Sequence, residues 1–256
     1  MAEGSTAQNA YDVIISRMFT LSTPEDRSYH HGDLRRALLS SALEILAEGG
    51  VAGLSLRAAA RRAKVSAMAP YRHFPDKEAL LAAVAEHGFR QLTARFTAAA
   101  AATPDPRAAL AALGVAYVLF ARDEPSLFKL MFGSSVEKKS AHPGLDEAGW
   151  ACFNTLRQAV ATVGFFDDEP ALNDVSLACW SLVHGLSALI VDGRLVDRGA
   201  GPPEAIAKRL TSLLVGALGA LAALADVKPP AAGSNTKKPA PDSLRQPARV
   251  DKRQRA

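Results

Sequence analysis

Cysteine is scarce in this sequence of 256 residues, which contains only Cys152 and Cys179. Their separation matches no metal site and no Cys-x-x-Cys motif. Each thiol falls in an apolar helical pattern, where an inert buried side chain is the expected role. We therefore expect no bound metal, no cofactor and a protein of the cytoplasm, because nothing here requires an oxidising compartment.

Long apolar runs and catalytic motifs are also missing. The longest nearly apolar stretch, Leu210–Ala225, is bounded by Arg209 and Asp226 and is shorter than the ~20 residues of a membrane span. The first residues have no basic lead, and their apolar run, Val13–Ile15, is too short for a signal peptide. No Ser/His/Asp order, Gly-x-Ser-x-Gly, P-loop or paired-carboxylate constellation appears. These absences predict a protein that does not enter a membrane and is not an enzyme.

Positive charge is concentrated in two segments of a chain whose net charge is +4. Between Lys228 and Ala256, eight Lys and Arg residues stand against two Asp, a net charge of +6 that leaves about −2 for the remainder. Within that remainder, Ser55–Lys77 contains six basic residues and one acidic residue, a net charge of +5 over 23 residues. Such a segment is either an anion-binding face or the solvated surface of a helix.

The apolar pattern is helical between two polar ends, without a convincing alternating strand. We expect an all-α protein with an N-terminal three-helix unit, a connecting helix and a larger bundle. The first helices are predicted from Asp33 to Glu48, from the Ser55 cap to Ala63, from the Ser66 cap to Phe74, and from the Asp76 cap past Phe96. The bundle helices are predicted near residues 106–122, 124–133, 143–163, 169–191 and 203–225.

The two short helices have the outline of a helix-turn-helix, which places its second helix in the major groove of DNA. The free amides of helices capped by Ser55 and Ser66 suit phosphate oxygens. Arg57 and Arg72 are long enough to reach guanine edges or phosphates. Pro70 lies near the start of the second short helix, where proline costs less than the ~3 kcal/mol of a helix interior. This pattern favours DNA binding over the solvated-surface alternative.

A family resemblance supports this interpretation. Leu54–Leu81, with Tyr-Arg-His-Phe-Pro-Asp-Lys-Glu beginning at Tyr71, resembles the DNA-binding domain of TetR-family transcriptional repressors. Ala178–Gly185 resembles the Trp…His-Gly signature of one subgroup, and Leu127–Phe132 resembles its Leu-Phe-x-Leu-Met-Phe helix. The resemblance implies DNA contacts from Ser55, Arg57, Ser66, Ala67, Met68, Tyr71, Arg72, His73 and Lys77.

One position departs from the family pattern. Lys64 occupies the turn position that the family usually fills with glycine. We expect Lys64 to adopt a backbone geometry that costs less for glycine than for other residues.

The bundle carries aromatic and soft apolar side chains in its middle helices. Core packing explains such residues in most helical proteins. In TetR-like proteins the same region encloses a small-molecule pocket. The resemblance therefore implies ligand contacts from Phe120, Phe128, Met131, Trp150 and Phe153, with Asn154 or Gln158 as polar handles.

The last two helices are rich in apolar and small residues. A helix that is apolar all round must be buried on every side, and small residues let backbones approach closely. We expect a homodimer whose interface includes Trp180, His184, Leu214, Gly216, Leu218 and Leu221. Trp180 and His184 are four residues apart, so they form either a packed pair that supports the core or dimer face, or part of a ligand pocket.

The sequence thus predicts a TetR-like homodimeric repressor that binds a palindromic DNA operator and is released by a small hydrophobic ligand. The expected organisation is a disordered extension (1–28), a helix-turn-helix domain (29–76), a connecting helix (77–102), a ligand-binding and dimerisation domain (103–226) and a disordered basic tail (227–256). The alternative is a ligand-independent DNA-binding or architectural protein, which a bundle without a pocket would favour.

Overall fold

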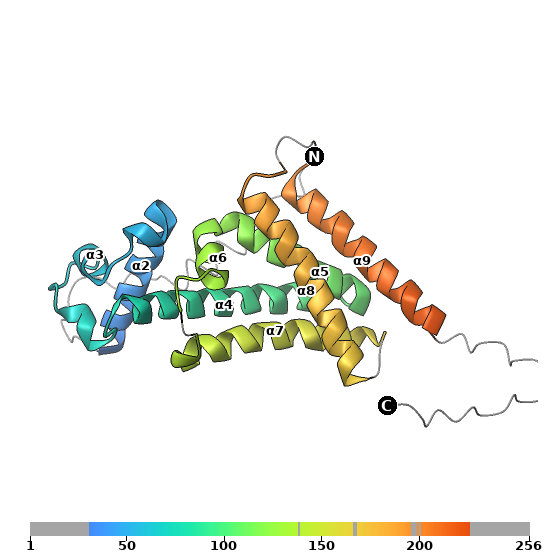
Figure 1. Cartoon of the computed structure of the whole chain (residues 1–256), viewed down its shortest axis with the longest axis horizontal. Coiled ribbons are helices and arrows are strands. Elements are labelled where there is room, and N and C mark those ends of the chain that lie inside the picture. The colour runs from blue at the N-terminus through green and yellow to red at the C-terminus, as the bar shows by residue number, and fades with distance from the viewer. Residues whose placement is uncertain (1–30, 138, 166–167, 196–198, 200, 226–256) are drawn as a thin grey trace, which may run out of the picture.

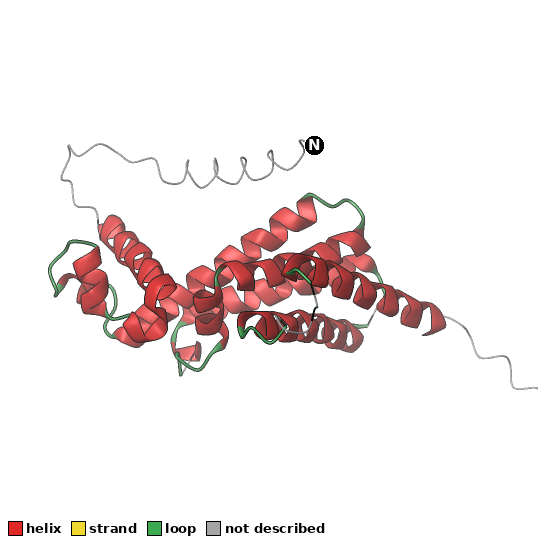
Figure 2. Ribbon diagram, turned by 90° about the horizontal axis from the view of Figure 1, so that it is seen from above, coloured by secondary structure: helices red, strands yellow, loops and turns green. Residues whose placement is uncertain are grey.

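The computed structural model describes residues 31–137, 139–165, 168–195, 199 and 201–225. All regular structure in these residues is helical, which confirms the all-α prediction. Figures 1 and 2 show an elongated molecule with the first helices at one end and α9 extending toward the other. The predicted N-terminal extension and basic tail lie outside the described residues.

Three elements form the N-terminal unit: α2 (His31–Gly53), α3 (Leu56–Arg62) and the 3-10 helix η1 (Ala69–Arg72). Ser55 caps α3 as predicted, because its hydroxyl accepts a hydrogen bond from the amide of Ala58 at 3.1 Å. The buried face of α3 packs against α2, so the unit has its own small core.

The second short helix of the predicted helix-turn-helix differs from the prediction. Instead of an α-helix over Ala67–Phe74 with a Ser66 side-chain cap, the structure has a four-residue 3-10 helix without a side-chain cap. The Ser66 carbonyl accepts a hydrogen bond from the amide of Ala69 at 3.0 Å. Pro70 is buried at the second position of η1, where its missing amide hydrogen forfeits no helical bond. Proline therefore belongs to the start of this element and does not interrupt it.

Two residues with positive φ shape the turns of this unit. Lys64, between α3 and η1, has a φ of 56° and is the single non-glycine residue with a positive φ in the described part of the chain. This confirms the geometry expected for that turn. Gly50, where the first helix was predicted to stop, has a φ of 63°, but helical structure resumes beyond it and α2 ends at Gly53.

The helix α4 (Lys77–Ala101) connects the N-terminal unit to the bundle. Its predicted cap is confirmed, because the Asp76 side chain accepts a hydrogen bond from the amide of Ala79 at 2.8 Å. Along its length α4 packs against α2 and against three helices of the bundle. Figure 1 shows it running from the end that carries α3 into the middle of the molecule.

The bundle follows the predicted bounds within one residue. It consists of α5 (Pro106–Asp123), α6 (Pro125–Phe132), the 3-10 helix η2 (Lys139–Ala141), α7 (Pro143–Val163), α8 (Glu169–Val191) and α9 (Pro203–Ala225). Each α-helix has proline in its first turn, where the fixed φ and the absent amide hydrogen suit a helix start. By length and composition alone α8 and α9 could cross a membrane, but here both pack against α5.

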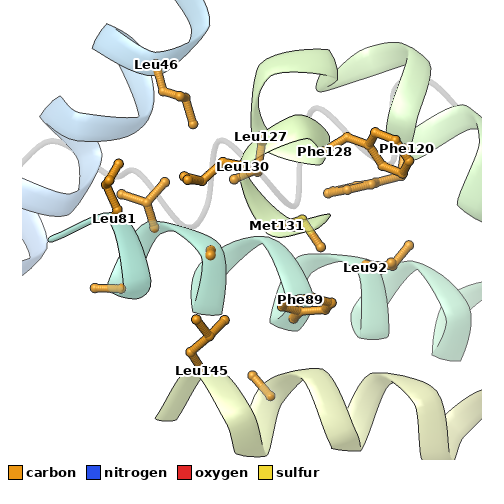
Figure 3. Packing of buried hydrophobic residues seen from close by; sticks show 14 of the residues in the cluster. Leu46, Leu81, Phe89, Leu92, Phe120, Leu127, Phe128, Leu130, Met131 and Leu145 are labelled. Atoms are coloured by element: carbon orange, nitrogen blue, oxygen red, sulfur yellow. The ribbon is translucent and has the colours of Figure 1, made fainter. Parts of the chain in front are cut away.

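The helix α6 contacts both the N-terminal unit and the bundle. In Figure 3, Leu130 of α6 lies between Leu46 of α2 and the α4 helix that carries Leu81. On its other side, α6 approaches α4 so closely that a Cβ at Gly88 would lie 2.5 Å from the sulfur of Met131. A single buried cluster therefore runs from the N-terminal unit through α4 and α6 into the bundle.

Candidate DNA-binding surface and ligand cavity

An exposed surface surrounds η1 and the start of α3. Met68 is 71% exposed and Tyr71 is 42% exposed, which is unusual for side chains of this size. The structure exposes eight of the nine predicted DNA-contacting residues: Ser55, Arg57, Ser66, Ala67, Met68, Tyr71, Arg72 and Lys77. These residues share the end of the molecule that lies away from α9 (Figure 1).

Not all positive charge in this segment is available to DNA. The guanidinium of Arg62 forms two hydrogen bonds with the carboxylate of Glu48, at 2.7 and 2.6 Å, and a third with Glu44 at 3.4 Å. The hydrogen bond from Arg62 lowers the pKa of the Glu48 carboxyl, so the pair remains charged. Arg62 therefore ties α3 to α2, and the composition of the segment overstates its free charge.

Lys77 and His73 have environments that the sequence did not reveal. The Lys77 ammonium donates a hydrogen bond to the carbonyl of Val51 at 3.2 Å, which joins the start of α4 to the last turns of α2. An ammonium has three donors, so two remain for a phosphate. His73 is half-buried, and its Nε2 atom is buried without a hydrogen-bond partner. A phosphate contact through that nitrogen would require the imidazole to turn.

A cavity of about 470 Å³ lies among α4, α5, α7, α8 and α9. This size is typical of small-molecule sites. Its wall is mostly apolar and contains Phe89, Leu92, Phe96, Leu110, Leu113, Gly114, Tyr117, Phe132, Leu145, Asp146, Gly149, Trp150, Cys152, Phe153, Leu156, Asn173, Leu177, Cys179, Trp180, Val183, Thr211, Leu214 and Val215.

The cavity wall contains two of the seven predicted ligand contacts. Trp150 and Phe153 line it, and their rings lie 5.9 Å apart. The other five predicted residues, Phe120, Phe128, Met131, Asn154 and Gln158, are absent from its wall. The first three of these are buried in the core, because aromatic and sulfur-containing side chains fill cores as readily as they line cavities. The polar side chains that do line the cavity include Asp146, Asn173 and Thr211, which sequence reasoning missed.

A hydrogen-bonded triad joins two residues of the cavity wall, Tyr117 and Trp180, to His184. The indole nitrogen of Trp180 donates to the Tyr117 hydroxyl at 3.2 Å, and that hydroxyl lies 2.8 Å from Nδ1 of His184. Burial raises the pKa of Tyr117 and lowers the pKa of His184, so both side chains are neutral near pH 7. Which of the two atoms donates in this hydrogen bond depends on the tautomer of the neutral imidazole. This arrangement explains why Trp180 and His184 occur four residues apart on α8.

The predicted dimer residues divide into two groups. Trp180, His184, Leu214 and Leu218 contact their own chain, and Leu218 is 7% exposed within the second core cluster. Gly216 and Leu221 are exposed on α9. Exposed apolar side chains that were not predicted accompany them, namely Leu177, Leu189 and Leu213. A monomer rarely leaves this many leucines uncovered on two adjacent helices.

The described residues offer no metal centre: no group of three or more His, Cys, Asp or Glu side chains among them could hold an ion. The chemistry of the molecule therefore resides in its exposed basic end and its apolar cavity.

Comparisons with known proteins agree with this division. Residues 38–84 match the family model described as bacterial regulatory proteins, tetR family, and residues 110–214 match the model described as tetracyclin repressor-like, C-terminal domain. Together these matches cover more than half of the chain. No curated protein sequence matches closely enough to count as a relative.

Solved structures give the same answer for the fold. A protein of unknown function from Rhodococcus sp. RHA1 is 35% identical, with a TM-score of 0.65 over 76% of this chain and 100% of that one. A transcriptional regulator from the same organism is 22% identical, with a TM-score of 0.56 over 72% and 94% of the two chains. The regulator FadR from Bacillus subtilis, solved with stearoyl-CoA, is 14% identical, with a TM-score of 0.56 over 71% and 97%.

Proposed function

The chain belongs to the TetR family of bacterial regulatory proteins, and on this premise we propose that it is a homodimeric repressor released from a palindromic operator by a small apolar ligand. Members of this family are DNA-binding transcriptional regulators and not enzymes. The further steps, which concern repression, the ligand and the operator, are argued from the residues of this chain.

The observation that carries the proposal is that α4 takes part in both sites. Its first residue, Lys77, is hydrogen-bonded to α2 beside the DNA-binding surface. Farther along the same helix, Phe89, Leu92 and Phe96 line the cavity. A ligand that shifts these three side chains would shift a helix whose other end begins five residues after the end of η1.

The helix α6 supplies a second connection. Phe132 of α6 lines the cavity and lies 4.8 Å, ring to ring, from His184. Two residues earlier on the same helix, Leu130 packs in the cluster that includes Leu46 of α2. Because the contact at Gly88 leaves no room for a Cβ, α4 and α6 would move together. Ligand and DNA would then favour different positions of these helices, which is the requirement for release.

The operator follows from the proposed dimer. The leucines exposed on α8 and α9 would pair with the same face of a second copy around a two-fold axis. Two η1 elements related by that axis would read half-sites separated by about one helical turn of DNA or a multiple of it. Arg57 and Arg72 are the side chains with the donors to read bases, while Tyr71 and Lys77 suit phosphates. Such a protein would act in the cytoplasm, where the DNA is.

The ligand has to be argued from this cavity. At 14% identity the likeness to FadR is one of fold, so its stearoyl-CoA says nothing about this chain. The cavity itself favours a ligand-responsive protein over the alternative of a ligand-independent DNA-binding protein. In a protein without a ligand, we expect the side chains of the bundle to fill this space.

The test is footprinting of the full-length protein on the DNA upstream of its own gene, with and without apolar compounds. We expect a protected palindrome that at least one compound abolishes, while reporter expression rises with the same compound. Protection without two-fold symmetry would contradict the dimer, and protection that no apolar compound weakens would support the ligand-independent alternative.

A further inference from the structure

The described wall of the cavity carries charge of one sign, which is negative. Among the residues described, Asp146 is the one Asp, Glu, Lys or Arg in that wall. The wall contains other ionisable groups, but burial raises the pKa of Cys152 and of Cys179 to about 11 and also raises that of Tyr117. These three groups therefore stay protonated and uncharged near pH 7. A bound molecule would meet a neutral wall with a single carboxylate.

The cations on the surrounding helices are engaged elsewhere. Arg157 of α7 is paired with Glu169, and Arg90 of α4 with Glu86 at 2.7 Å. Arg107 of α5 lies over the ring of Phe165, 5.0 Å from its centroid. A buried anionic group would have no counter-ion in this wall, and at the exposed end it would meet the like charge of Asp146. This wall would therefore exclude an anionic group.

The cavity also has two unlike ends. Its α7 wall runs from Leu145 to Leu156, about 16 Å at the helical rise of 1.5 Å per residue. The wall residues that cluster with Leu156, namely Leu110, Cys179 and Val215, are buried, whereas Asn173 and Leu177 of α8 line the cavity and are exposed. At the other end Asp146 and Trp150, one turn apart on the same face of α7, reach solvent, and Trp150 is 64% exposed. A carboxylate beside an indole ring is a suitable site for an organic cation.

Building on the proposed function, we propose that the cavity binds an elongated apolar molecule with a cationic head group, held between the Asp146 carboxylate and the Trp150 ring. The apolar tail would extend along α7 toward Leu156. A neutral head group would be accepted less tightly, and an anionic head group least of all. The Asp146 carboxylate lies in the first turn of α7, where its negative charge also disfavours the binding of an anion to the free helix amides.

The chain provides its own reporter for this proposal. It contains two tryptophans, Trp150 and Trp180, and both line the cavity. Intrinsic fluorescence of the full-length protein therefore reports on cavity occupancy, and Trp150→Phe and Trp180→Phe variants would locate the change. Three probes share one tail and differ in head-group charge at pH 7: decylamine, 1-decanol and decanoate.

We expect decylamine to bind most tightly, 1-decanol next, and decanoate at least about tenfold more weakly than decylamine. Asp146→Asn should weaken decylamine about three- to tenfold and leave 1-decanol unchanged. Glu147→Gln is the matched control, because Glu147 is an exposed neighbour on α7 that does not line the cavity.

Equal affinity for decanoate and decylamine would overturn the proposal, as would an equal effect of the Asp146 and Glu147 variants. If no probe alters the fluorescence while the protein still protects a palindrome, the ligand class assigned here is wrong and the DNA-binding function stands. Loss of specific DNA protection in the unmodified protein would instead refute the proposed function.

Discussion

The two ends of α4 present opposite kinds of surface. At one end, Arg57 of α3 is exposed, as are Tyr71 and Arg72 of the four-residue 3-10 helix η1, which is held by a few hydrogen bonds. At the other, α4 and the bundle helices enclose a cavity whose charged wall residue is Asp146. The first surface uses side chains that packing does not need, whereas the second is built from side chains continuous with the core. Substitutions in the two regions should therefore fail in different ways.

The largest expected effect separates core from cavity inside the bundle. Phe120→Ala should lower the free energy of unfolding by about 3–5 kcal/mol, because Phe120 is fully buried and removing its ring leaves a hole. Trp150→Ala should leave stability nearly unchanged, since Trp150 is largely exposed, yet weaken ligand binding. Chemical denaturation and ligand titration of both variants make the comparison. Equal destabilisation by the two would erase the distinction between core and cavity.

The next effect separates the DNA surface from the bundle. Arg72→Ala should weaken operator binding by about 1–3 kcal/mol and leave stability unchanged, because Arg72 is exposed and was assigned a base or phosphate contact. Arg122→Ala removes the same charge from α5, where Arg122 is hydrogen-bonded to Asp123 at 2.6 Å, and serves as the control. Fluorescence anisotropy with the operator measures both. A similar loss for Arg122→Ala would mean that net charge, and not position, sets the affinity.

A smaller effect concerns the strained turn. Lys64→Gly should raise the free energy of unfolding by about 0.5–1 kcal/mol, because glycine adopts the positive φ with less strain. The greater conformational entropy of glycine in the unfolded chain offsets part of this gain. Lys64→Gln removes the charge but retains the strain, so it should not stabilise. Thermal denaturation distinguishes the two variants. If both also reduce the salt dependence of DNA binding, the lysine contributes a phosphate contact, and equal stability of both would show that the turn is unstrained.

The smallest effect is a pH dependence confined to the bundle and α4. Burial lowers the pKa of His184 and of His87 below the ordinary 6.5, so the unfolded chain takes up these protons first as the pH falls. The stability that the neutral side chains contribute is present above about pH 6.5 and is lost below it. His184→Asn should therefore show a smaller loss of thermal stability between pH 7.5 and pH 5.5. An unchanged loss would assign the dependence to other groups.

The difference between the exposed end and the cavity also explains which features could be predicted from the sequence. Helix starts were predictable because Ser55 and Asp76 act as local caps and proline opens each bundle helix. The predicted DNA-contacting residues lie within one short segment, so a local motif was enough to propose them. The type of the recognition element was not predictable, because the choice between α and 3-10 geometry over four residues depends on the tertiary packing around Pro70.

The cavity could not be predicted from local pattern. Asp146, Asn173 and Thr211 come from three helices, and nothing in the spacing of one helix brings them together. Phe120 and Phe153 read alike in the sequence, yet one is fully buried in the core and the other lines the cavity. The Tyr117 hydroxyl bridges two residues more than sixty positions away in the chain, a pairing that only the fold reveals.

The length of α4 between Lys77 and Phe96 determines how far a tilt of the helix at the cavity displaces its other end. Nineteen residues separate Lys77 from Phe96, or about 28 Å at 1.5 Å per residue. A tilt of about 5° pivoting at the Phe96 end moves the Lys77 end by about 2.5 Å, which is most of the ~3.4 Å that separates neighbouring base pairs. Under the proposed function, a tilt of this size, shared with α6, would be sufficient to take η1 out of step with its groove.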